Sequence, residues 1–150
     1  MTTIVDEPAD LLGLVGQSLG TTEWMKVTQH QVDMFAEATG DRQWIHTDPE
    51  RAARGPFKST IAHGYLTLSL APSAIAQVLE IREQTAALNY GLDRVRFPAP
   101  VRVGTQVRAA VAVASARQKT SGVESVFTLT YEIDGGDRPA CVADVIVLYP

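Results

Sequence analysis

The sequence lacks several features that would assign it to a specialised class of protein. Its single cysteine, Cys141, rules out an intrachain disulfide and any CxxC zinc or redox motif. No apolar run reaches the ~18 to 20 residues that a membrane-spanning helix needs. Basic residues do not dominate, because 13 lysines and arginines against 17 acidic residues give a formal net charge of -4. The charge pattern of a duplex-binding protein is absent, and we expect neither nucleic acid nor a membrane as a partner.

What is present is the composition of an ordinary globular chain. Of its 150 residues, 45% are hydrophobic and 20% are charged. Surface scaling predicts that a chain of this size buries about two thirds of its surface on folding, which favours one domain over residues 1–150. The amino terminus has no basic region and carries Asp6, Glu7 and Asp10, unlike a signal peptide. We therefore expect a single cytoplasmic domain.

Two start signals predict helices in the first third of the chain. A capping box begins at Thr28, and apolar residues then recur at helical spacing until Gly40, which predicts a helix over 28–39. Asp48, followed by proline, has the form of an N-cap and predicts a short helix over 48–54. Residues between these two helices are expected to form a loop.

The stretch HGYLTLSLAPSAIAQVL, residues 63–79, is apolar almost all round. This pattern indicates a helix buried on most sides. Pro72 either kinks this helix or restarts it, because an interior proline removes a backbone hydrogen bond and clashes with the preceding turn. The sequence leaves both possibilities open.

After residue 85 the hydrophobic period changes to two, which is typical of strands. Alternating runs separated by short glycine-containing turns predict a three-stranded antiparallel meander over 105–149. Earlier strands are expected near 20–27 and 86–97, and the prolines of FPAPVRVGT suggest a bulged or edge entry into the sheet. The predicted fold class is α+β, with an antiparallel sheet wrapped over the apolar helix. One small sheet cannot cover such a helix alone, so we expect a homodimer.

The densest functional signal lies between the first two predicted helices. Here Asp41 and His46 fall in the predicted loop, where side chains can converge on a pocket. A carboxylate and an imidazole together can hold one water and exchange its protons near neutral pH. A turn aspartate and a structural histidine are the alternative interpretation of the same residues.

The stretch FAEATGDRQWIH, residues 35–46, resembles the signature of the MaoC-like, or hydratase 2, family. The spacing and both polar residues match, whereas Gln43 replaces the usual asparagine and Trp44 the usual proline. IAHGYLTLSL resembles the start of the family's central helix, and NYGLDRVRFPAPVRVGT resembles the strands that follow. Within the family, the chain looks like the short nodulation-protein-N-like group. The resemblance implies a hotdog fold, with a sheet wrapped around a long central helix, and a dimer.

The resemblance also implies an activity, (R)-specific hydration of trans-2-enoyl thioesters of coenzyme A or acyl carrier protein to (R)-3-hydroxyacyl thioesters. In that family the residues matching Asp41 and His46 hold and activate the water. Gly91 falls where the family places a backbone donor for the thioester oxygen, and Ser69 falls where relatives have a supporting serine. No cofactor is implied, since coenzyme A is part of the substrate. The acyl chain length and the carrier stay open.

Two alternatives from other functional classes also fit the sequence. A hotdog thioesterase would use a carboxylate without needing the pairing of Asp41 with His46, and a non-catalytic acyl-thioester-binding dimer is favoured by the departures at Gln43 and Trp44. A metal site is a further alternative, because His46-x-Asp48 with His63 imitates a two-histidine, one-carboxylate set. Asp48 is better explained as a helix cap, so we expect no metal.

Overall fold

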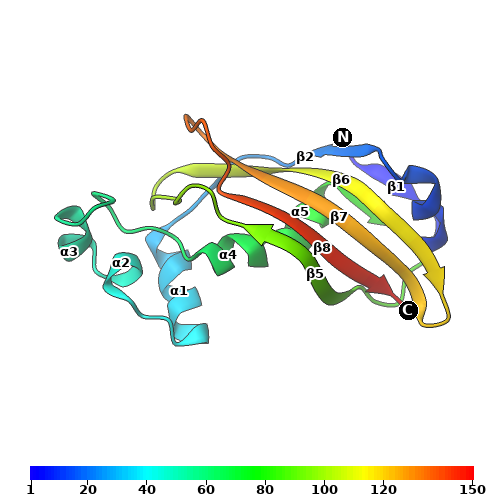
Figure 1. The fold of residues 1–150 in the computed structure, drawn as a ribbon, viewed down its shortest axis with the longest axis horizontal. Helices are drawn as coiled ribbons and strands as arrows, with labels where there is room; N and C mark the ends of the chain where they lie inside the picture. The colour runs from blue at the N-terminus through cyan, green and yellow to red at the C-terminus, as the bar shows by residue number, and fades with distance from the viewer.

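A computed structural model, which describes residues 1–150, is built around one six-stranded antiparallel sheet (Figure 1). Its spatial order is β2-β6-β7-β8-β5, and β3 also pairs with β6. The strands are β2 (Ser18–Thr21), β3 (Met25–Lys26), β5 (Leu88–Arg96), β6 (Gln106–Lys119), β7 (Gly122–Ile133) and β8 (Cys141–Tyr149). The predicted meander over 105–149 is therefore confirmed as β6, β7 and β8.

The turn between β6 and β7 depends on a glycine. Gly122 has a φ of 131°, a backbone conformation that side chains disfavour, and a Cβ placed there would overlap the main-chain oxygen of Tyr149 on β8.

The strand expected near 20–27 is split into β2 and β3. The strand expected near 86–97 is β5, which lies at the edge of the sheet.

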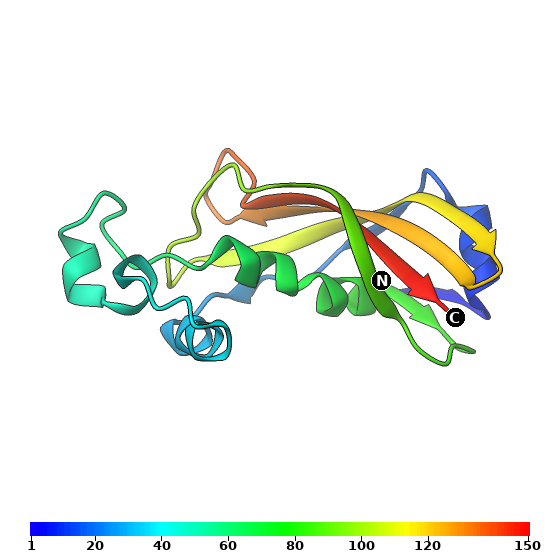
Figure 2. The ribbon, with the colours of Figure 1, turned by 60° about the horizontal axis from the view of Figure 1, so that its bottom comes forward.

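The apolar segment forms two helices in series, α4 (Gly64–Ser69) and α5 (Ala71–Val78). Pro72 lies in the first turn of α5, so the proline restarts the helix rather than kinking it. Figure 2 shows both helices against one face of the sheet. Within one chain, the two helices are buried only on the side that faces the sheet. Ala74 and Val78 are buried, whereas Ala76 is exposed and Tyr65 is 70% exposed. The expectation of burial on most sides therefore does not hold for one chain alone.

Two elements near the amino terminus carry no clear sequence period. The parallel pair of β1 (Thr3–Val5) with β4 (Leu79–Ile81) forms a separate two-stranded sheet. The 3-10 helix η1 (Pro8–Leu14) buries Leu11 fully in the core. Three-residue strands are too short to show alternation, which explains why the sequence did not predict them.

The remaining helices gather at one end of the sheet (Figure 1). They are α1 (Gln29–Thr39), α2 (Trp44–Thr47) and α3 (Pro49–Ala53). The predicted N-cap and C-terminal glycine are confirmed: the Thr28 hydroxyl accepts from the N–H of Gln31 at 3.2 Å, and Gly40 is left-handed with a φ of 80°. The return bond of the predicted capping box is not formed, because the Gln31 amide contacts Met25 Sδ instead. None of the helices has the length and apolar character needed to cross a bilayer.

The loop expected between α1 and α3 contains the short helix α2, so His46 lies on a helix and the prediction of a loop was wrong there. The Gln43 carbonyl accepts from the N–H groups of His46 and Thr47, and the Thr47 hydroxyl donates to it as well. A single turn held by such local bonds is too short to leave a hydrophobic period.

Candidate active site

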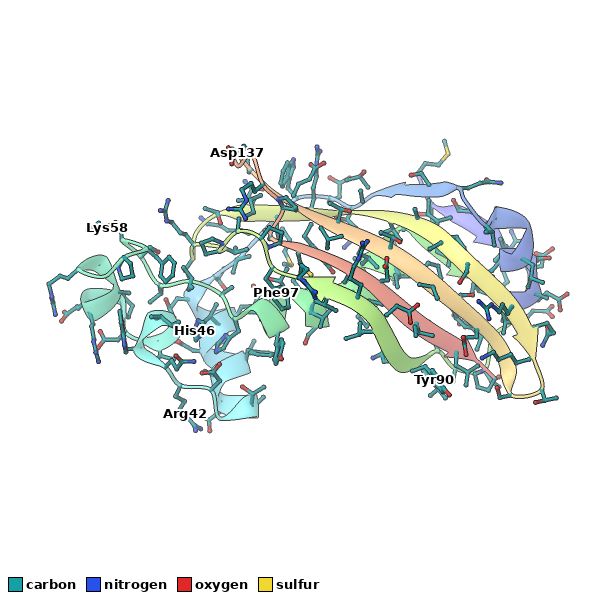
Figure 3. All side chains as sticks on the ribbon, in the orientation of Figure 1. Arg42, His46, Lys58, Tyr90, Phe97 and Asp137 are labelled. Atoms are coloured by element: carbon teal, nitrogen blue, oxygen red, sulfur yellow. The ribbon has the colours of Figure 1, made fainter.

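Asp41 and His46 line a pocket of about 440 Å³ between α1, α2 and the start of α4. The pocket is lined by Phe35, Thr39, Asp41, His46, His63, Gly64, Tyr65 and Phe97. Figure 3 places His46 at the helical end of the molecule, with Phe97 between it and the sheet. Two of the four predicted site residues therefore share one pocket.

The Asp41 carboxylate is held at one oxygen and open at the other. The left-handed Gly40 turns the chain out of α1, and Oδ1 then accepts from the side chain of Gln43 at 3.2 Å and from its main-chain N–H at 3.5 Å. Oδ2 lies 3.9 Å from Nε2 of His46. Burial opposes ionisation of Asp41, but the bonds from Gln43 and the proximity of His46 bring the pKa of the carboxyl below its usual value. The group is an ionised acceptor at neutral pH.

His46 presents an unprotonated nitrogen to the same space. Its Nδ1 lies 2.7 Å from the carbonyl oxygen of Ile61, and because a carbonyl only accepts, Nδ1 carries the proton and Nε2 a lone pair. Burial lowers the pKa of His46, and the bond to Ile61 opposes this without reversing it. Gln29 on α1 donates from its side chain to the His46 carbonyl at 2.7 Å and so fixes α2 from outside.

Gln29 is the centre of a small polar network that the sequence analysis missed. Its Oε1 accepts from the hydroxyl of the buried Thr60 at 2.6 Å, so one side chain links α1, α2 and the chain that leads into α4. A glutamine at the first position of a helix carries no sequence signal for this role.

His63 is the third polar group of the pocket. Its Nε2 lies 2.9 Å from the main-chain oxygen of Asp41, and its ring stacks on that of His46 with centroids 3.8 Å apart and planes 22° apart. Ligand atoms of these three residues lie within 4.8 Å of one another, the spacing of a possible metal site. A metal ion lies close to the plane of each imidazole that binds it, and the planes of these two stacked rings do not meet within bonding distance of both, so the geometry does not suit coordination by both histidines. Asp48 instead caps α3, accepting from the N–H of Arg51 at 3.1 Å.

Ser69 and Gly91 lie away from this pocket. Both line a second hollow of about 320 Å³ between the central helices and the edge of the sheet, which neither Asp41 nor His46 lines. The Ser69 hydroxyl donates to the main-chain oxygen of Tyr65 one turn earlier, at 2.6 Å. Within the chain, the structure does not bring these two predicted residues to the first pair.

Gly64 is a candidate that the sequence analysis overlooked. It begins α4, directly beside His63, and lines the pocket that contains Asp41. The main-chain N–H of Gly64 has no acceptor in the chain, as is usual for the first residue of a helix. A Cβ at this position would lie 3.0 Å from the ring of Phe97, so a larger residue would crowd that ring. The sequence feature that could have identified Gly64 is a glycine at the start of an apolar helix.

The two departures from the family signature have structural roles. Gln43 supplies the bonds to Asp41 described above. The Trp44 ring packs over Gly55, where a Cβ would lie 3.0 Å from it, and under the guanidinium of Arg51, which lies 4.4 Å from the ring centroid. Trp44 thus holds α2 against α3 by packing, in place of a proline's fixed backbone.

Comparison with known proteins agrees with these features. The family described as MaoC like domain matches residues 11–135. The chain is 48% identical over 142 residues to 3-hydroxyacyl-thioester dehydratase Z of Mycobacterium tuberculosis, covering 94% of each. It is 46% identical over 143 residues to nodulation protein N of Rhizobium leguminosarum, covering 93% of this chain and 89% of the relative.

The solved structures give the same result for the fold. The (R)-hydratase from A. caviae involved in PHA biosynthesis superposes with a TM-score of 0.74 at 27% identity, covering 91% of this chain and 96% of the other. The antiparallel sheet around a central helix is the hotdog fold of these enzymes, as the resemblance implied. The chain therefore belongs to the MaoC-like domain family and is a hydro-lyase of its dehydratase type.

Proposed function

We propose that this enzyme adds water reversibly to trans-2-enoyl thioesters of coenzyme A or acyl carrier protein, giving (R)-3-hydroxyacyl thioesters. One observation carries the proposal: two acceptors, Asp41 Oδ2 and His46 Nε2, lie 3.9 Å apart at the same pocket. A water placed about 2.8 Å from each can donate one O–H group to Oδ2 and the other to Nε2. The printed names of the relatives, a 3-hydroxyacyl-thioester dehydratase and an (R)-hydratase, support this substrate class.

In the proposed reaction, His46 Nε2 takes a proton from the water as its oxygen attacks C3 of the enoyl group. The lowered pKa of His46 keeps this nitrogen free at neutral pH, and the lowered pKa of Asp41 keeps a carboxylate beside the imidazolium that forms. The same proton then passes from His46 to C2. Because the water and the imidazole lie on one side of the substrate, both additions occur on one face.

Negative charge develops on the thioester oxygen during attack and needs a donor. We assign this role to the N–H of Gly64, because it is unpaired and Gly64 lines the pocket that contains Asp41 and His46. Gly64 replaces Gly91 in this proposal, since Gly91 lines the other hollow. No metal and no cofactor beyond the substrate's own carrier take part in these steps.

We also propose that the enzyme acts as a homodimer joined along β5. This edge strand is paired with β8 on one side only, and it exposes Leu88, Tyr90 and Leu92. The hollow beside it is lined mostly by apolar residues of α4, α5 and β8. An open strand edge next to an apolar hollow is suited to a second copy of the same surface.

The experiment that tests the proposed activity follows crotonyl-CoA with two readouts in one reaction, loss of enoyl absorbance and release of free thiol. Hydration removes the absorbance without releasing thiol. Thiol release with the enoyl group intact would instead show a thioesterase, and binding of the thioester without turnover would show an acyl-thioester-binding protein. Chiral analysis of the product tests the (R) configuration.

A further inference from the structure

His63 is a buried, titratable residue to which the proposed reaction gives no role. Its side chain lies at the start of α4 and the residue is only 3% exposed. It nevertheless touches both residues of the proposed pair: Nε2–H donates to the main-chain oxygen of Asp41 at 2.9 Å, and the ring stacks on His46. The ring of Phe35 lies against His63 as well, with centroids 4.9 Å apart.

The bond to Asp41 is a long-range contact for a segment otherwise held locally. The Asp41 N–H donates to the Thr39 hydroxyl at 3.4 Å, and its carboxylate accepts from Gln43. Among the hydrogen bonds of Asp41, the bond from His63 alone comes from outside residues 39–43. Because Asp41 is followed by exposed residues and its side chain is 41% exposed, this bond fixes where the carboxylate stands relative to α4.

The second ring nitrogen of His63 shows that stability alone does not explain why a histidine occupies this position. Since Nε2 faces a carbonyl oxygen, it carries the proton, and Nδ1 is left as a buried lone pair with no partner. An unpaired buried polar atom costs free energy that an apolar side chain of similar size would avoid. A histidine that lowers stability in this way, at the wall of a pocket, calls for an explanation other than stability.

We infer that His63 is a positioning residue for the reaction: it holds the Asp41 main chain through Nε2–H and fixes the plane of the His46 ring by stacking. This inference rests on the proposed function, since it concerns the same pair of residues. His63 itself touches no reacting atom. Without His63, Asp41 and His46 remain present, but no contact from the start of α4 fixes the distance between them.

Two variants separate the two contacts. His63→Gln keeps an N–H donor near the position of Nε2 but has no ring, whereas His63→Phe keeps a ring but has no donor. Displacing a catalytic group by about 1 Å can cost on the order of 10² in rate, so His63→Phe should lower kcat by at least roughly tenfold while KM changes little. His63→Gln should recover part of that loss. Thr67→Val, at a buried threonine of the same helix that does not line the pocket, is the matched control and should keep wild-type kcat.

A second measurement tests whether His63 acts through Asp41. In an Asp41→Asn background, His63→Phe should add little further loss, because residues that work through one another lose activity non-additively. Thermal melts of all variants show which of them are folded. Imidazole nitrogen chemical shifts of the wild-type enzyme, which need no activity, should show His63 protonated at Nε2 and bare at Nδ1.

The outcomes distinguish this inference from the proposed function. If wild-type enzyme does not hydrate crotonyl-CoA, the proposed function fails, and the nitrogen shifts still test the contact of His63 with Asp41. If wild-type enzyme is active and Asp41→Asn is not, the inference is overturned by full kcat in both His63 variants. It is also overturned if His63→Phe and Asp41→Asn reduce kcat by fully additive factors.

Discussion

Oδ2 of Asp41 lies 3.9 Å from Nε2 of His46, which is too far for a direct hydrogen bond and close enough for one water to contact both atoms. Neither atom has another hydrogen-bond partner in the chain, because Gln43 takes Oδ1 and the Ile61 carbonyl takes Nδ1. Both acceptors are thereby left for the same ligand. This arrangement predicts that the two residues act as one unit.

Asp41→Asn keeps the shape of the side chain but removes the charge, and His46→Gln keeps a polar head but removes the titrating nitrogen. Each should lower kcat for crotonyl-CoA hydration by about 10² to 10⁴, the usual loss when a general acid or base is removed. The double variant should be little worse than the poorer single variant. Enoyl absorbance gives the rates, and a thermal melt of each variant serves as control. An Asp41→Asn enzyme that melts normally and keeps most wild-type turnover would show that this pocket is not the active site.

The pH dependence follows from the burial of His46, which lowers its pKa below the ordinary value of 6.5. The free Nε2 is needed as the base, so kcat/KM should be constant at neutral pH and fall only as pH drops through the lowered pKa. An acid limb centred above 6.5 would contradict the assignment of His46 as the base.

The same shift predicts an effect on stability. Below pH 6.5 the unfolded chain binds a proton at His46 more readily than the folded chain does. The contribution of His46 to the free energy of unfolding is therefore complete above that pH and is lost as pH falls through it towards the lowered pKa. Melts of wild type and His46→Gln from about pH 5 to about pH 8 should show a smaller acid-side decline in the variant.

Gln43, one of the departures from the family signature, holds Oδ1 of Asp41. Gln43→Ala removes the side-chain bond, so the pKa of Asp41 should rise towards its usual 3.8 and the carboxylate should gain freedom. We expect about a tenfold loss of kcat, since small displacements of a positioned group cost that much or more. Arg42→Ala is the control, because Arg42 forms only an exposed ion pair with Glu37 at 3.0 Å. Equal kcat in the two variants would leave Gln43 without a role.

The sequence predicted those parts of the fold and site that depend on local signals. The caps at Thr28 and Asp48 and the alternation of the meander gave helices and strands close to those observed. The resemblance of residues 35–46 to the family signature pointed to Asp41 and His46, a pair that the fold brings to one pocket. The residues that support this pair, His63 and Gln29, reach it from other elements, and such long-range contacts leave no mark in the local sequence.

The oxyanion donor that we propose, Gly64, differs from the one expected from the sequence, Gly91. Gly64→Ala keeps the N–H but places a Cβ 3.0 Å from the Phe97 ring, so the ring or the start of α4 must move by a few tenths of an ångström, and kcat should fall by about tenfold. Gly91→Ala is the matched test of the other glycine, because within the chain its Cβ would meet only Ile146, at an ordinary 3.7 Å. We expect Gly91→Ala to keep near-normal kcat. The reverse ranking would restore Gly91 as the donor.

The proposed dimer gives the last prediction. Leu92 lies on the edge strand β5, is 49% exposed and lines the apolar hollow beside α5. A lysine there would put a charge into a surface that the dimer buries, and exposed lysines on edge strands oppose pairing. Wild-type enzyme at micromolar concentration should sediment at twice the chain mass of 16.2 kDa, and Leu92→Lys should shift it to the monomer. Leu12 provides the control: it is 43% exposed but belongs to η1, which packs on β6 and β7, so Leu12→Lys should leave the dimer intact. A wild-type monomer, or a Leu92→Lys dimer as tight as wild type, would show that β5 is not the interface.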